Sequence, residues 1–164
     1  MKKDITQNRI CIIGGHLTPA LAILDELMDQ GHKDIFWIGS KYSQTHNKNT
    51  SLEYLTIKKY PIKFVELKAG KLWRKFTKKT LFPGLYNTLL IPFGFIHSCF
   101  IIIKYKPDLV ISFGGYLALP VVVIAKLLGK KTITHEQTLV TGTTNKFIAK
   151  YADKVCVSWH ESMK

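Results

Sequence analysis

Acidic residues are scarce in this chain of 164 residues, which has 11 Asp and Glu against 24 Lys and Arg and a formal net charge of +13. Such an excess of positive charge indicates an acidic partner, which could be nucleic acid, anionic lipid or a phosphorylated substrate. A hydrophobic fraction of 46% excludes a disordered chain and fits one domain with a sizeable core. The placement of the charges therefore has to identify the partner.

Cysteine is also scarce, with 3 residues far apart in the sequence and each inside an apolar run. An odd number argues against a disulfide framework, and none of the three has metal-ligand spacing. We expect Cys11, Cys99 and Cys156 to be buried, reduced thiols of a cytoplasmic protein without a metal site. We expect no signal peptide, because the first apolar run is short and soon broken by Gly14 and Gly15.

Two common nucleotide-binding motifs are missing. The first glycine turn, Gly14-Gly15-His16, lacks the G-x-G-x-x-G spacing of dinucleotide-binding proteins, and no Walker A loop occurs. No acidic residue closes the second expected strand, where a ribose would need one. We therefore expect no cofactor.

No charged residue occurs between Lys79 and Lys104, a length that could span a bilayer. Two prolines and two glycines within this segment make a lone spanning helix a poor interpretation. We expect a helix at about 85–105 that lies on the membrane, or packs on the sheet with one apolar end exposed.

What the sequence does have is a regular alternation of short β-rich runs and helical patterns. Thr18 is expected to cap the first helix, and residues 39–50 are expected to be a polar loop. Strict alternation predicts βαβ units, and hence a Rossmann-like α/β domain over residues 1–164 with helices on both faces of a parallel sheet. The expected strands are 9–13, 35–38, 62–67, 109–113, 132–135 and 155–158, and the expected helices are 19–31, 85–105, 120–128 and 143–151.

Two glycine turns resemble each other. Gly14-Gly15-His16 and Gly114-Gly115-Tyr116 each follow an expected strand and precede a helix that a proline begins. Ligands of a parallel sheet bind beyond the carboxyl ends of its strands, and helix N-termini attract anions. Either turn alone is explained as a tight βα connection. The pair indicates a site for a diphosphate.

Polar side chains follow the same edge of the sheet. His16 could act as a general base on a sugar hydroxyl. A second cluster begins directly after the strand expected at 132–135, and these residues could line a cleft or simply cap the next helix. The candidate cleft residues are Thr18, His135, Glu136, Gln137, Gly142 and Asn145.

A basic and aromatic segment precedes the long apolar helix. Lysines and arginines beside large apolar side chains are typical of an element that binds a membrane surface, and each cation contributes about 1 kcal/mol near anionic lipid. A nucleic-acid site would not need an apolar helix attached to it, so we expect no nucleic acid partner. The candidate membrane-binding residues are Lys71, Trp73, Arg74, Lys75, Phe76, Lys78, Lys79, Leu81 and Phe82.

Three segments together resemble the MurG-type glycosyltransferases. Residues 14–22 are similar to the first glycine loop and helix of that family, and residues 106–120 to its second glycine loop. His135-Glu136-Gln137, followed by Gly142 and Asn145, is similar to the family's His-Glu-Gln-Asn segment. The matches run in order from about residue 10 to 158.

The resemblance implies the N-terminal half of a two-domain GT-B enzyme that works at the cytoplasmic face of the bacterial plasma membrane. In that family the N-terminal domain binds the lipid-linked acceptor, lipid I, and a C-terminal domain binds the donor UDP-N-acetylglucosamine. Transfer inverts the anomeric centre without a required metal and gives lipid II. The residue matching His16 is the family's proposed base, and the glycine loops are thought to hold the acceptor diphosphate.

The donor-binding domain is expected to be absent from these 164 residues and to lie in the same or a separate chain. The alternative is a non-catalytic subunit that recruits a separate catalytic chain to the membrane. A third interpretation, a basic nucleic-acid-binding domain, predicts salt-sensitive binding to DNA or RNA without lipid.

Overall fold

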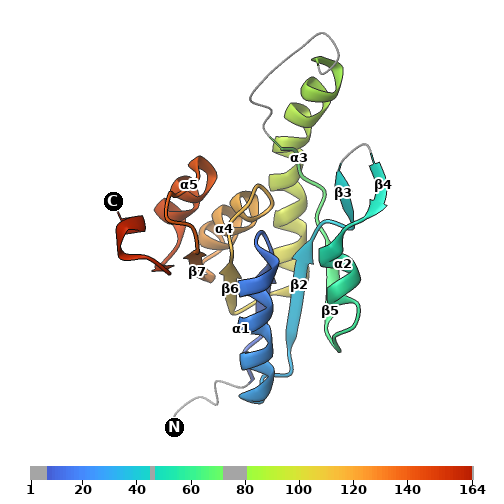
Figure 1. Cartoon of the computed structure of the whole chain (residues 1–164). Helices are drawn as coiled ribbons and strands as arrows, with labels where there is room; N and C mark the ends of the chain where they lie inside the picture. Colours follow the sequence, from blue (N-terminus) through green and yellow to red (C-terminus); the bar gives the residue numbers. More distant parts are fainter. Residues whose placement is uncertain (1–6, 45–46, 72–80, 164) are drawn as a thin grey trace.

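The computed structural model of the chain describes residues 7–44, 47–71 and 81–163 (Figure 1). A 6-stranded sheet has the order β5-β2-β1-β6-β7-β8, and every neighbouring pair of its strands is parallel. The strands of this sheet are β1 (Ile10–Ile13), β2 (Ile35–Gly39), β5 (Lys63–Glu66), β6 (Leu109–Ser112), β7 (Lys131–Glu136) and β8 (Lys154–Val157). The helices are α1 (Leu17–Asp29), α2 (Leu52–Ile57), α3 (Leu81–Tyr105), α4 (Ala118–Leu127), α5 (Thr143–Tyr151) and the 3-10 helix η2 (His160–Met163).

Helices cover both faces of the sheet, as the sequence predicted. In β1, Cys11 and Ile13 belong to a core that includes buried residues of α3, α4 and α5. Ile10 and Ile12 belong to a second core, which includes residues of α1 and α2. A strand that is buried on both faces has no polar face, and this explains why β1 and β2 are continuous apolar runs.

The first helix begins earlier than predicted. α1 starts at Leu17, so Thr18 is its second residue and not its cap; the predicted cap was wrong. His16 occupies the N-cap position and makes no capping hydrogen bond with its side chain. Pro19 is tolerated in the first turn, because N–H groups there have no partner within the helix.

The predicted polar loop at 39–50 is wrong. β3 (Tyr42–Gln44) and β4 (Asn47–Thr50) form an antiparallel hairpin, and the short helix α2 follows it. Ser51 caps α2 by accepting a hydrogen bond from the N–H of Tyr54 at 3.1 Å. The hairpin is polar on both faces, and it therefore lacks the apolar alternation by which a strand is detected.

Two glycines let the long helix α3 pack closely on the segment that follows β5. A Cβ atom on Gly94 would lie 2.6 Å from the Cβ of Ala69, and one on Gly70 would lie 2.8 Å from the N of Ile91. Ile101 and Ile102 at the other end of α3 are buried against the sheet. The N-terminal part of α3 rises past the end of the sheet (Figure 1). The structure therefore has the helix packed on the sheet, as one of the two predicted arrangements has it, and its exposed apolar side chains extend along the helix from Leu85 to Ile103.

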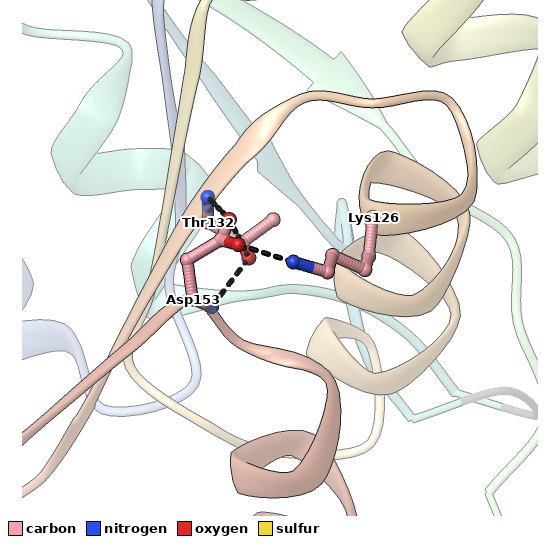
Figure 2. A network of polar contacts seen from close by, with 3 residues as sticks. All are labelled: Lys126, Thr132 and Asp153. Carbon is pink, nitrogen blue, oxygen red and sulfur yellow. Dashed lines mark hydrogen bonds and ion pairs between the residues drawn. The ribbon is translucent and has the colours of Figure 1, made fainter.

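Asp153 lies between α5 and the edge strand β8, and it is bonded to residues of α4 and β7 (Figure 2). Asp153 accepts hydrogen bonds from the N–H and the hydroxyl of Thr132, at 2.8 and 3.0 Å, and forms an ion pair with Lys126 of α4. The hydrogen bond from Lys126, followed by those from Thr132, lowers the pKa of Asp153 from 3.8 to about 2. Side chains from α4 and β7 therefore hold the start of β8 in register.

The cysteines follow the prediction only in part. All three are free, but Cys11 is buried whereas Cys99 and Cys156 are half-buried. Strand β8 is an edge strand with one uncovered side, which explains the exposure of Cys156. In the part of the chain that the structure describes, no group of three or more His, Cys, Asp or Glu could hold a metal ion.

Candidate functional site

The two glycine turns touch each other at the carboxyl edge of the central strands. A Cβ atom on Gly15 would overlap the carbonyl oxygen of Gly114, and one on Gly115 would lie 3.2 Å from the Cα of Gly15. Gly114 and Gly115 have φ values of +78° and +81°, which favour glycine. The two similar glycine turns, which lie 100 residues apart in the sequence, thus form one compact structure.

In the second turn, the N–H groups of both glycines already donate to side chains of the domain. The N–H of Gly114 donates to the hydroxyl of Ser112 at 3.1 Å, and the N–H of Gly115 donates to Oδ1 of Asn145 at 3.2 Å. Within the described residues, the N–H groups of Gly15, His16 and Tyr116 have no hydrogen-bond partner. Donors for an anion therefore come from the residues around the two helix N-termini, and not from Gly114 or Gly115 themselves.

Glu136 connects the predicted polar cluster to the second glycine turn. Its Oε2 accepts a hydrogen bond from the side-chain amide of Asn145 at 2.8 Å, and its Oε1 accepts one from the N–H of Thr138 at 2.9 Å. Asn145 in turn accepts from Gly115, so a continuous chain of hydrogen bonds joins β7, α5 and the turn. These side chains do not cap α5, since Gly142 holds its N-cap position without a side-chain hydrogen bond.

The pKa of Glu136 is lowered although its carboxyl is buried. Burial raises the pKa of Glu136, but hydrogen bonds from Thr138 and Asn145 and the nearby His16 outweigh it, and the net pKa is lowered. Glu136 is therefore ionised although only 4% of its surface is exposed. The side chain of His16 is exposed, so it is open to a ligand at this edge of the sheet.

His135 and Gln137 carry buried polar atoms that have no partner in the described part of the chain: Nδ1 of His135, and Oε1 and Nε2 of Gln137. The other ring nitrogen of His135 lies 3.2 Å from the hydroxyl of Ser158. Unpaired buried polar groups cost about 1–3 kcal/mol each. A pocket of about 230 Å³ borders His135, Glu136 and Asn145 and extends towards Ser162. Of the predicted cleft residues, His135, Glu136 and Asn145 line this pocket. Gln137, Gly142 and Thr18 are not part of its lining, and Thr18 is an exposed residue of α1.

Sequence reasoning missed Glu53 of α2. Its Oε1 accepts a hydrogen bond from the indole N–H of Trp37 at 2.8 Å. A Cβ atom on Gly39 would lie 2.7 Å from its Oε2, and one on Gly14 would overlap its Oε1. Burial raises the pKa of Glu53 to about 7, although hydrogen bonds from Trp37 and Ser40 oppose this. Glu53 lies in the first turn of α2, a short helix that was not predicted from the sequence, and no motif in the sequence shows that this carboxyl reaches the first glycine turn.

Tyr116 lies near both Glu53 and Lys71. Its hydroxyl is hydrogen-bonded to Ser40; burial, with a smaller contribution from the charge of Glu53, raises its pKa. The ammonium group of Lys71 lies 6.0 Å from the centre of the Tyr116 ring. Lys71 is thus a predicted membrane-binding residue that the structure places beside the glycine turns.

The remaining predicted membrane-binding residues are not tested by these contacts. Six of them lie outside the described residues, namely Trp73, Arg74, Lys75, Phe76, Lys78 and Lys79. Leu81 and Phe82 begin α3, but their side chains are not described. Residues 84–105 are long and apolar enough to cross a membrane by length and composition, with 28% of their most apolar window buried.

Comparison with known proteins identifies the family. The model of the glycosyltransferase family 28 N-terminal domain matches residues 13–157. A transferase of Borrelia hermsii, described as UDP-N-acetylglucosamine--N-acetylmuramyl-(pentapeptide) pyrophosphoryl-undecaprenol N-acetylglucosamine transferase, is 37% identical over 92% of this chain and 39% of its own length. The protein of the same description from Treponema denticola is 33% identical over 91% of this chain and 37% of its own length. The chain therefore spans about two fifths of the length of these relatives.

Solved structures agree with this assignment. The crystal structure of MurG from Acinetobacter baumannii superposes with a TM-score of 0.67 at 26% identity, over 94% of this chain and 42% of that one. The calicheamicin glycosyltransferase CalG4 has a TM-score of 0.52 at 15% identity, over 84% of this chain and 34% of that one, and shows the shared fold alone. The chain belongs to glycosyltransferase family 28, and the matched part is the N-terminal domain of that family.

Proposed function

We propose that this chain is the acceptor-binding half of an inverting glycosyltransferase. It would bind lipid I at the cytoplasmic face of the bacterial plasma membrane, so that N-acetylglucosamine passes from UDP-N-acetylglucosamine to the acceptor and lipid II forms. The donor would bind a second domain, in the same or a separate chain. The observation that carries the proposal is the contact between the two glycine turns, where the N–H groups of Gly15, His16 and Tyr116 have no hydrogen-bond partner among the residues that the structure describes.

The chemistry assigned to the site follows from its hydrogen bonds. The diphosphate of the acceptor accepts from N–H groups around the start of α1 and α4, where the helix dipoles also favour negative charge. His16 takes the proton of the attacking hydroxyl as its oxygen bonds to the anomeric carbon and the nucleoside diphosphate leaves. Glu136, held ionised by hydrogen bonds from Thr138 and Asn145, supplies a negative charge in the site.

Three buried side-chain atoms that lack a partner among the described residues, Nδ1 of His135 and Oε1 and Nε2 of Gln137, support a second part of the proposal. Buried polar atoms without partners are rare in folded domains, and a ligand or a neighbouring domain that supplies hydrogen bonds removes their cost. We assign this edge of the site, with Gly142 and the pocket beside Asn145, to the cleft between the acceptor-binding and donor-binding domains.

Exposed apolar side chains along α3 support attachment to a membrane surface. They recur at spacings of three and four residues over about 27 Å of helix, with Lys104 next to the C-terminal end of the stripe. An apolar stripe of this kind fits the surface of a bilayer. Its members are Leu85, Leu89, Phe93, Ile96, Phe100 and Ile103.

The test is binding of this chain, on anionic liposomes, to a lipid I analogue and separately to UDP-N-acetylglucosamine. We expect the acceptor analogue to bind and the nucleotide sugar not to bind; the reverse result would refute the assignment of this domain. In the chain joined to a donor-binding domain, His16→Ala should lower kcat about 10²–10⁴-fold with a small effect on KM, whereas the exposed His160→Ala should leave both unchanged. Acceptor binding together with full activity of the His16→Ala enzyme would favour the recruiting-subunit alternative.

A further inference from the structure

A second pocket, of about 180 Å³, opens on the side of the glycine turns that faces the hairpin β3–β4. Gly14, Gly15 and Gly115 form one wall. The side chains opposite are mainly neutral hydroxyls and a carboxyl, and no lysine or arginine is among the described residues that line the pocket. These side chains are suited to an uncharged group that both donates and accepts hydrogen bonds. The polar side chains that line it include Ser40, Tyr42, Ser43, Ser51, Glu53 and Tyr116.

The carboxyl of Glu53 is built into this pocket. The indole of Trp37 holds one of its oxygens, and both Gly14 and Gly39 lack a Cβ where this carboxyl lies. Glu53 is one of the residues that line the pocket. A carboxyl group offers about four lone-pair sites, and the hydrogen bonds from Trp37 and Ser40 use only part of this capacity. Because burial raises its pKa to about 7, the group can donate as well as accept near neutral pH.

We propose that this pocket is the subsite for the sugar ring of the lipid-linked acceptor, and that Glu53 hydrogen-bonds to a hydroxyl or acetamido group of that ring. The inference rests on the proposed acceptor function and adds the part of the ligand that this pocket binds. The glycine wall lets the ring approach the backbone closely, and the ring of Tyr116 provides an apolar surface beside the polar groups. The wall contains Gly15, the residue before His16, so the sugar is held next to the proposed base.

The test uses two probes that carry the same charge. One is a farnesyl diphosphate whose second phosphate is esterified to an N-acetylated amino sugar, and the other carries a methyl group in place of the sugar. We expect the wild-type chain to bind the sugar ester about tenfold or more tightly than the methyl ester, which is the usual effect of a hydrogen bond to an ionisable group. Glu53→Ala should abolish this preference and leave binding of the methyl ester unchanged.

Two further variants complete the design. Glu53→Gln keeps an oxygen that accepts from Trp37 and should retain part of the preference. Glu26→Gln changes an exposed carboxyl near the C-terminal end of α1, which does not line the pocket. This variant should retain the whole preference. Binding of the methyl ester shows in each case that the variant is folded.

The outcomes separate this inference from the proposed function. If the wild-type chain binds both probes equally, or if Glu53→Ala keeps the preference for the sugar, the subsite is refuted while diphosphate binding stands. If the wild-type chain binds neither probe, the proposed acceptor function fails. If the preference for the sugar disappears in Glu53→Ala and is kept in full by Glu26→Gln, the subsite is established.

Discussion

The pH dependence of stability offers the sharpest test of the structure around the first glycine turn. The pKa of Glu53 is raised from 4.5 to about 7 in the folded chain, with burial as the main cause. A difference of this size between the folded and unfolded states corresponds to about 3 kcal/mol of unfolding free energy. Small domains are stable by only about 5–15 kcal/mol, so the effect is large enough to measure.

The sign follows from the number of bound protons. Below pH 4.5 the carboxyl is protonated in both states, and it imposes no penalty on folding. Between 4.5 and about 7 the unfolded chain ionises while the folded chain keeps its proton, so stability falls as the pH rises. Above about 7 the loss is complete, because the folded chain then holds a buried charge.

The assay is urea denaturation of the wild-type chain and the Glu53→Gln variant at several pH values between 4 and 8.5. Glutamine has nearly the same shape, keeps an acceptor for Trp37 and does not titrate. We expect the stability of the variant relative to the wild type to rise by about 3 kcal/mol over this range. A constant difference between the two proteins at all pH values would show that the carboxyl is not buried as described, and the argument would fail.

Three further predictions concern the neighbouring turns and the sheet edge. Gly15→Ala should destabilise the chain by about 1–3 kcal/mol in urea denaturation, because its Cβ meets backbone of the second turn, whereas Gly142→Ala meets nothing within 4 Å and should be neutral; equal effects would contradict the contact. Asn145→Ala should cost about 1–3 kcal/mol and raise the pKa of Glu136, because it removes one hydrogen bond from that carboxylate and leaves the N–H of Gly115 without its partner. Carboxyl NMR measures this pKa, and an unchanged value would contradict the network. Asp153, with its pKa lowered to about 2, should contribute stability that is present above pH 3.8 and lost as the pH falls towards 2; an Asp153→Asn variant with the acid denaturation profile of the wild type would contradict this.

Much of the fold could be predicted because its determinants are local. The central strands are buried on both faces and are continuous apolar runs, which made β1, β2 and β6 readable from the sequence. The prediction failed at 39–50 because the hairpin is stabilised by backbone pairing between polar residues and has no apolar face. It also misplaced the start of α1, since His16 precedes the helix without a side-chain cap that would mark it.

The site was predicted less completely than the fold. The glycine turns and the cluster after β7 carry visible motifs, and the structure brings them together through Asn145. Which backbone donors are free could not be predicted, because Gly115 gives its N–H to a side chain 30 residues away. Glu53 carries no motif, and its importance depends on packing between α2 and the ends of β1 and β2.

By itself, the sequence determined the α/β class, the parallel sheet, the two glycine turns and the basic charge, because each is set by periodicity, by backbone freedom at glycine or by composition. Only the tertiary structure decided which of these features meet. The contact between Gly15 and Gly114 requires the parallel pairing of β1 with β6, two strands separated by nearly 100 residues. The raised pKa of Glu53 and the lowered pKa of Glu136 arise in the same way, because burial and hydrogen bonds from distant segments act on them only in the folded chain.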